Sequence, residues 1–162
     1  MVGAALLPCL ACAEGTLTMS SGLDFSTGKY GSSQHTDTVY VPVIAKYEVG
    51  NWTVRATVPW VSITGPGGVV GSGSDRVTID GVARTRRTTE SGLGDIVAGA
   101  TYTVFEQGGW VVDVGGKVKF GTGSASRGLG TGENDVSVQA DVYRSFGPAS
   151  VFTTVGYKRM GD

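Results

Sequence analysis

Residues 39–60 have the sequence VYVPVIAKYEVGNWTVRATVPW, in which apolar and polar side chains alternate on both sides of a central Gly-Asn pair. Alternation with a period of two is typical of β-strands that have one apolar and one polar face. Gly50-Asn51 between two such runs is a tight-turn signal, so the segment predicts an antiparallel hairpin. Pro42 interrupts the first run, and because proline has no N–H we expect a bulge there.

The same alternation recurs along the chain and predicts strands at residues 16–26, 38–49, 52–60, 95–104, 110–120, 135–143 and 150–158. The composition agrees, because 27 of the 162 residues are glycine and only 17% are charged, which is poor in helix formers. A net charge of −1 gives no global attraction to nucleic acid or anionic lipid. We therefore expect an all-β protein and no nucleic-acid partner.

The lengths of the connections favour a membrane barrel over a soluble sandwich. Tight turns near Gly50, Gly108 and Gly147 alternate with longer connections at residues 28–34, 64–92 and 121–134. Short periplasmic turns opposite long outer loops give this rhythm in an antiparallel up-and-down transmembrane β-barrel. Residues 69–82 are the one place where an eighth strand is conceivable, but their glycine and arginine density favours a loop.

Aromatic residues flank the three tight turns and predict a belt at one membrane interface. The belt consists of Tyr47, Trp52, Tyr102, Phe105, Trp110, Tyr143 and Phe146. The alternative is that these aromatics are core residues at the hairpin ends of a soluble sheet. A soluble core would be expected to concentrate them in mid-strand instead.

The N-terminal segment predicts export. Residues 2–13 are small and apolar, and Ala11-Cys12-Ala13 before Glu14 has the form of a signal-peptidase site, although no Lys or Arg precedes the apolar run. We expect a signal peptide at residues 1–13 and a barrel segment at residues 14–162, which has no cysteine. A buried strand or plug formed by residues 2–13 is the alternative.

Seven crossings leave the chain with an odd strand count, whereas single-chain bacterial barrels have an even number and no open edge. The chain also stops at Asp162 without the aromatic residue that usually ends the last strand. We therefore expect a C-terminally truncated part of a larger barrel.

Charged side chains fall on the face opposite the aliphatic one and predict a polar lumen. They are Lys46, Glu48, Arg55, Asp95, Asp113, Lys117, Lys119, Asp141 and Lys158. Their mixed signs could tune the selectivity of a permeation path, or they could form a network that stiffens the wall. Asp95 begins a strand at the outer rim, where it could accept hydrogen bonds from loop amides.

A basic cluster of Arg76, Arg84, Arg86 and Arg87 lies in the longest connection. Guanidinium groups there could bind lipid phosphates or narrow the mouth of the barrel, and a solvated loop face is the alternative.

Enzymatic and cofactor chemistry has little support in the sequence. The Gly-rich stretches at residues 121–123 and 128–132 open no helix that could hold a phosphate. His35 is the only histidine and has no nucleophile or oxyanion context. We expect no enzyme, no cofactor and no metal site.

Three motifs resemble a bacterial outer-membrane family whose members are labelled transporters or likened to a protein of the MetA pathway of phenol degradation. The motifs are Ser91-Gly92-Leu93-Gly94-Asp95, Lys117-Val118-Lys119-Phe120-Gly121 and Gly130-Thr131-Gly132-Glu133-Asn134-Asp135. The resemblance covers most of the chain after Ala13. It implies a barrel of about twelve strands in longer members and passage of small, aromatic or apolar molecules across the outer membrane.

These observations predict an outer-membrane channel or transporter for passive passage of small molecules. Its partners would be outer-membrane lipid, lipopolysaccharide and an unidentified solute, and its oligomeric state is open. A structural or surface-interaction barrel with a plugged lumen is the second hypothesis. A soluble exported β-sheet protein is the third.

Overall fold

The computed structural model describes residues 4–12, 15–29, 35–65, 69–70, 77–78 and 87–161, with side chains in 15–29, 35–65 and 87–161. The strands are β1 (Ala4–Cys12), β2 (Gly15–Gly22), β3 (Asp24–Gly28), β4 (Thr36–Val49), β5 (Trp52–Gly65), β6 (Val69–Val70), β7 (Val77–Thr78), β8 (Thr88–Leu93), β9 (Ile96–Gln107), β10 (Trp110–Phe120), β11 (Asp135–Phe146) and β12 (Ala149–Arg159). A single 3-10 turn, η1 (Ala125–Arg127), is the one helical element in this part of the chain. No described helix is long and apolar enough to cross a membrane.

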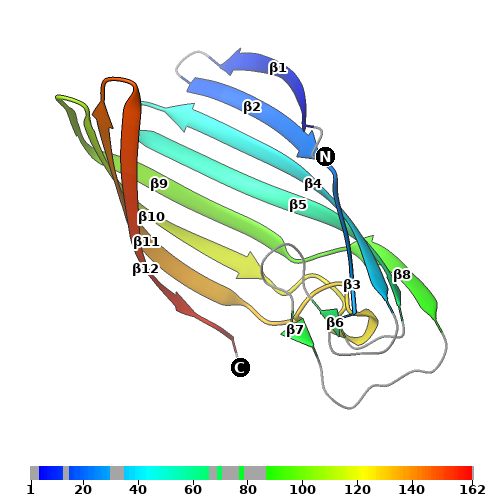
Figure 1. Ribbon diagram of the computed structural model, residues 1–162. Coiled ribbons are helices and arrows are strands. Elements are labelled where there is room, and N and C mark those ends of the chain that lie inside the picture. The colour runs from blue at the N-terminus through cyan, green and yellow to red at the C-terminus, as the bar shows by residue number, and fades with distance from the viewer. Residues whose placement is uncertain are drawn as a thin grey trace.

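The main sheet has the strand order β1-β2-β4-β5-β9-β10-β11-β12, and every pairing in it is antiparallel. The strands follow one another across the sheet in the order of the sequence, which is an up-and-down arrangement; β3 also pairs with β4, and β8 also pairs with β5. Strands β1 and β12 do not meet, so the described sheet is an open, curved wall (Figure 1). The predicted all-β, antiparallel fold is confirmed, and each of the seven predicted strands is present.

The strand ends that the tight turns join lie at one end of this wall, and the strand ends next to the longer connections lie at the other (Figure 1). Val49 pairs with Trp52, Trp110 with Gln107 and Phe146 with Ala149, so each tight turn has two residues between paired strand ends. Gly108 and Gly109 both have positive φ angles, 59° and 81°, as the favoured two-residue hairpin turn requires.

Two prolines divide the wall into two zones: one in which β4 and β5 pair with β2 and β9, and one in which they pair with β3 and β8. Pro42 of β4 lies directly opposite Pro59 of β5 in an unbroken register, so the bulge predicted at Pro42 is wrong. The carbonyl of Pro59 points away from β4, and it accepts a 2.9 Å hydrogen bond from the backbone N–H of Gly94. A residue's N–H points to the same side as its C=O in an antiparallel strand, so the N–H that Pro59 lacks would have faced this neighbour.

The neighbouring strands are interrupted opposite these prolines. Leu23 separates β2 from β3 beside Pro42, and Gly94-Asp95 separates β8 from β9 beside Pro59. The missing N–H groups therefore end two ladders without disturbing the β4–β5 pairing.

Beyond the prolines the sheet continues further than predicted. Strand β5 runs on to Gly65 and pairs with β8, although residues 64–92 were expected to form a loop. Residues 69–70 and 77–78 form a separate two-stranded ladder, β6–β7, rather than an eighth strand of the wall.

The N-terminal segment forms edge strand β1, which pairs with β2 along most of its length. A strand is compatible with the alternative given for residues 2–13, a buried strand or plug, but the burial of these residues lies outside the described side chains. Removal of a signal peptide ending at Ala13 stays a prediction, and it would leave β2 at the edge of the sheet.

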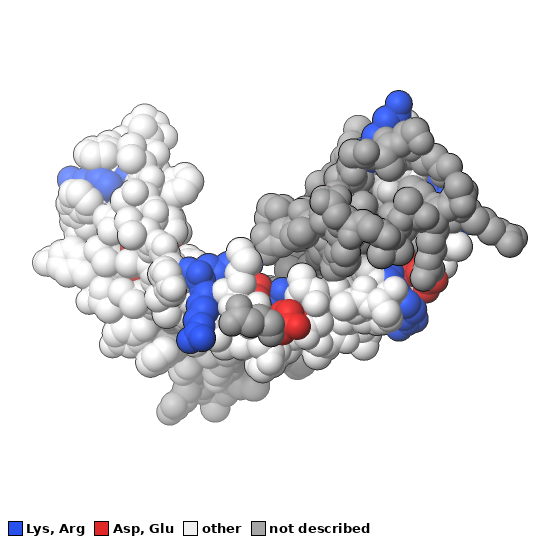
Figure 2. Space-filling model, turned by 90° about the horizontal axis from the view of Figure 1, so that it is seen from below, with Lys and Arg blue, Asp and Glu red and all other residues white. Residues whose placement is uncertain are grey.

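The two faces of the wall differ in chemistry. Large apolar side chains such as Val54, Val114 and Val155 lie exposed on one face, because strand alternation places them all on the same side. The only buried apolar cluster among the described residues is Val61, Ile63 and Leu129, with Tyr40 packed against it. In Figure 2, Lys, Arg, Asp and Glu side chains gather near the middle of the described part of the molecule.

Candidate functional site

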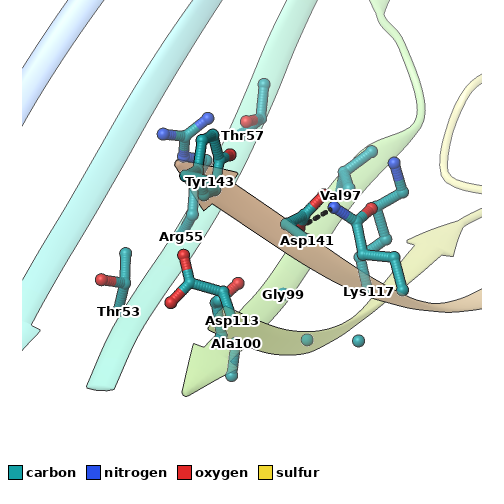
Figure 3. Close-up of a pocket in the computed structure, with 14 residues that line it drawn as sticks. Thr53, Arg55, Thr57, Val97, Gly99, Ala100, Asp113, Lys117, Asp141 and Tyr143 are labelled. Atoms are coloured by element: carbon teal, nitrogen blue, oxygen red, sulfur yellow. Dashed lines mark hydrogen bonds between the residues drawn. The ribbon is translucent and has the colours of Figure 1, made fainter. Parts of the chain in front are cut away.

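The middle of the polar face forms an open hollow of about 410 Å³. Its floor is built by β5, β9, β10 and β11, whose inward residues include Arg55, Asp113, Lys117 and Asp141 (Figure 3). These are four of the nine charged residues predicted for the lumen. Thr53, Thr101, Gln139 and Tyr143 also line the hollow.

The register places the two cations of the floor, Arg55 and Lys117, in one transverse row with two further lysines. Arg55 lies opposite Lys46 on one side and opposite Gly99 on the other, and Gly99 in turn lies opposite Lys117. Beyond Lys117 the row continues through Ser137 to Lys158. Cations from four strands are therefore aligned across the wall.

Gly99 allows the wall to curve between Arg55 and Lys117. A Cβ atom on Gly99 would lie 2.9 Å from the carbonyl oxygen of Gly116 and 3.0 Å from Cβ of Lys117. Gly115 is similarly close to its neighbour, since its Cβ would lie 2.7 Å from Oγ1 of Thr101. Glycines at such positions permit close backbone approach and leave the floor open.

The two carboxylates of the floor accept hydrogen bonds from neutral donors. Asp113 accepts from the hydroxyl of Thr103 at 2.7 Å. Asp141 accepts from the hydroxyl of Thr154 at 2.6 Å and from Nε2 of Gln139 at 2.8 Å. These bonds hold both carboxylates against the wall without using a cation.

Arg55 and Lys117 are not held by such hydrogen bonds. Within the described ranges neither side chain makes an ion pair or a hydrogen bond, and both are exposed. Their positive charges are therefore available to whatever occupies the hollow.

A second charged group lies at the loop end of the same face, and we call it the rim network: Asp95, Lys119, Asp135 and Lys158. Nζ of Lys119 lies 3.0 Å from Asp135 and 3.6 Å from Asp95, and Nζ of Lys158 lies 3.1 Å from Asp135. The side chains of Asp95, Lys119 and Asp135 are at most 18% exposed. The charges of the rim network are thus paired, and those of Asp95, Lys119 and Asp135 are largely removed from solvent, whereas Lys158 is 37% exposed.

The rim network fixes the connection between β10 and β11. Asp95 accepts hydrogen bonds from the backbone N–H groups of Gly123 and Thr131, both at 2.9 Å, and from the Thr131 hydroxyl at 3.1 Å. Lys119 donates to the same hydroxyl at 2.6 Å. Asp95 therefore does contact loop amides, as its position at the start of a strand suggested.

The same connection turns inward and buries Leu129. Its side chain is 2% exposed and packs against Val61 and Ile63 on the inner face of β5. Gly94 makes room for this packing, because a Cβ there would lie 2.9 Å from Val61 and 3.2 Å from the carbonyl oxygen of Leu129. Residues 121–134 thus form a docked loop on the inner face of the wall.

The remaining predicted charges are engaged elsewhere. Lys46 forms a 2.8 Å ion pair with Glu48 near the turn end of β4. Arg87 forms an ion pair with Asp37 where β4 and β8 approach the loops. Arg76, Arg84 and Arg86 lie outside the described residues, so the predicted basic cluster stays a prediction.

Most of the predicted aromatic belt lies exposed on the apolar face. Trp52 contacts Tyr102 with ring centroids 4.9 Å apart, and Arg144 lies over the ring of Trp110 at 4.8 Å. Phe105 and Phe146 are exposed near the same turns, whereas Tyr47 is half-buried.

Tyr143 does not belong to this belt. It lines the hollow with Asp141 and stacks on Phe152 at 6.2 Å, so its assignment to the membrane interface is wrong. Its position two residues after Asp141 places both side chains on the same face of β11.

Sequence reasoning missed two residues that the structure brings to the polar face. Asp135 is the centre of the rim network. Its alternation with Ser137 and Gln139 could have placed it on the polar face from the sequence alone. Leu129 was an isolated apolar residue in a Gly-rich connection. No group of three or more His, Cys, Asp or Glu side chains that could hold a metal ion occurs in the described part.

Comparison with known proteins gives one positive result. Neither a curated protein nor a solved structure matches the chain. Residues 18–157 match the model of the family described as "Putative MetA-pathway of phenol degradation". This range includes strands β4 to β11 entirely, together with the floor and most of the rim network. The chain therefore belongs to the family described as the MetA pathway of phenol degradation.

Proposed function

We propose that this protein forms the wall of a passive outer-membrane channel for small molecules, with single-ring or other largely apolar solutes among them. The observation that carries the proposal is the chemical difference between the two faces of the wall. Exposed Val, Phe, Trp and Tyr side chains cover one face, and a hydrated hollow with unengaged cations occupies the other. An apolar outer band around a polar interior is the design of transmembrane β-barrels.

The proposed channel requires no chemistry from the protein beyond solvation and selection. Lipid tails would surround the apolar face, while Trp52, Tyr102 and Trp110 would fix its depth at the interface. A solute would pass along the floor, where hydroxyl, amide and charged groups replace part of its hydration. We propose no enzymatic activity and no cofactor.

A plugged structural barrel is the second candidate, and the docked loop favours it. Leu129 and the rim network hold residues 121–134 against the inner face, where they narrow the loop end of the lumen. In this alternative the outer loops would serve as a surface for lipopolysaccharide or other partners.

Conductance separates the two candidates. The full chain, purified in detergent and inserted into planar lipid bilayers, is expected to give steady ohmic current steps if the lumen is open. A plugged barrel gives no steady current, and this result would overturn the channel.

Cell fractionation tests the proposed location. The protein is expected to sediment with outer membranes and to migrate faster on a detergent gel before heating than after. A soluble exported sheet protein, the third hypothesis, would show neither behaviour.

A further inference from the structure

We infer that the floor of the hollow holds a binding site for a small organic carboxylate, formed by Arg55 and Lys117 on either side of Gly99. This inference rests on the proposed channel, since it names the class of solute that the channel would hold in transit. Its test includes a measurement that does not depend on current.

The register brings the two cations to one site. Arg55 of β5 and Lys117 of β10 both lie opposite Gly99 of β9, which has no side chain. With neighbouring strands about 4.8 Å apart, the two Cα atoms are separated by roughly 10 Å. In Figure 3 the charged ends of Arg55 and Lys117 lie on opposite sides of the hollow. Two long cationic side chains at that Cα separation can both reach one anionic group above the glycine after rotation about their side-chain bonds.

Neither cation is neutralised by the protein around it. Asp113 is four residues from Lys117 on the same strand, roughly 13 Å along the sheet, and Asp141 lies opposite Asp113. Both carboxylates already accept hydrogen bonds from threonine or glutamine. A guanidinium and an ammonium group without a partner in a concave hollow favour an anionic ligand.

The lining also indicates the kind of anion. Two cations and two carboxylates line the hollow, so a multiply charged anion would be repelled by Asp113 and Asp141. A carboxylate matches the planar fork of Arg55, which can donate two parallel hydrogen bonds. Val97 and Tyr143 line the same hollow and offer apolar surface for a ring or short chain. The volume of about 410 Å³ lies within the range of ligand sites.

Benzoate and benzamide are the matched probes, because they share the ring and differ in charge. Isothermal titration of the full chain in detergent is expected to show binding of benzoate and much weaker binding of benzamide. Inorganic phosphate is the third probe and is expected to bind more weakly than benzoate.

The variants Arg55→Gln and Lys117→Gln are each expected to weaken benzoate binding at least about tenfold, the effect of losing one charge-assisted hydrogen bond. Arg159→Gln is the control, since Arg159 follows Lys158 on β12 and points to the opposite face. It should bind benzoate like the original chain. Heat-modifiable migration on a detergent gel verifies that each variant is folded.

Equal binding of benzoate and benzamide, unchanged binding by both glutamine variants, or tighter binding of phosphate would each overturn the carboxylate site. Benzoate binding by a protein that carries no current would support the site and overturn the channel. Current without benzoate binding would support the channel and overturn the site.

Discussion

The floor and the rim network lie on the same face of the wall, yet they use their charges in opposite ways. At the rim, Lys119 and Lys158 converge on Asp135, and Asp95 holds the amides of the docked loop. On the floor, Arg55 and Lys117 have no partner within the described residues, and Asp113 and Asp141 take only neutral donors.

This difference separates a structural role from a functional one. Paired charges with little exposure restrain the loop and stiffen the wall, and removing one partner leaves another buried charge uncompensated. Exposed cations without partners contribute little to folding, but in the proposed channel they would set the potential that a solute meets. Changes at the rim should therefore alter stability, and changes on the floor should alter selectivity.

Asp135→Asn is expected to have the largest effect on stability. Asp135 is 6% exposed and pairs with two lysines, so its neutralisation should lower the free energy of unfolding by about 3 kcal/mol. Urea titrations of the protein in lipid vesicles, followed by tryptophan fluorescence, measure this change.

Asp141→Asn is the matched control on the floor. Asp141 is 8% exposed, close to the value for Asp135, but its partners are neutral. Its loss should cost about 1 kcal/mol. Equal losses for the two variants would contradict the distinction between rim and floor.

Leu129→Ala should release the docked loop. The substitution removes most of a side chain that is 2% exposed and should weaken docking by about 2 kcal/mol. Amide hydrogen exchange at Gly123 and Thr131 is then expected to accelerate roughly 30-fold, because each 1.36 kcal/mol is a factor of ten.

Leu93→Ala provides the comparison for Leu129→Ala. Leu93 is 52% exposed, so its truncation leaves the loop docked. If Leu129→Ala also raises conductance, the docked loop is a constriction of the lumen. Unchanged exchange at Gly123 in Leu129→Ala would show that Asp95 alone holds the loop.

The strands and the tight turns were predictable because each depends on local chemistry. Alternation with period two defines the strands, and Gly50-Asn51 fixes the hairpin register that places Lys46 opposite Arg55. Tyr143 shows how such reasoning can fail, since the residue type suggested a membrane interface while its place in the alternation indicated the polar face. The alternation was the better guide.

The two zones and the docked loop were not predictable from local patterns. The effect of Pro42 depends on which neighbour its missing N–H would have faced, and this depends on the register with Pro59. The burial of Leu129 depends on contacts with Val61, more than sixty residues away in sequence. Whether Arg55 finds a partner likewise depends on strands far along the chain.

Charge reversal on the floor should change selectivity while nearly preserving stability. The double variant Arg55→Glu with Lys117→Glu should alter the free energy of unfolding by less than about 1 kcal/mol, because both side chains are exposed. In a salt gradient across a planar bilayer, the reversal potential should shift toward cation selectivity. Arg159→Glu, on the opposite face, should leave the reversal potential unchanged.

Added salt should have the smallest effect on stability and still distinguish the two regions. Raising KCl from about 0.1 M to about 1 M shortens the screening length from about 10 Å to about 3 Å. Arg55 and Lys117 are exposed, so the ion selectivity that they confer should weaken strongly. Lys119 and Asp135 are 3.0 Å apart and largely buried, so the free energy of unfolding should change by less than about 0.5 kcal/mol. Reversal potentials and urea titrations at both salt concentrations test this. If high salt lowers the free energy of unfolding but leaves the ion selectivity intact, the assignment of the two regions is reversed. The charges of the rim would then be the ones that salt screens, and those of the floor the ones that it does not.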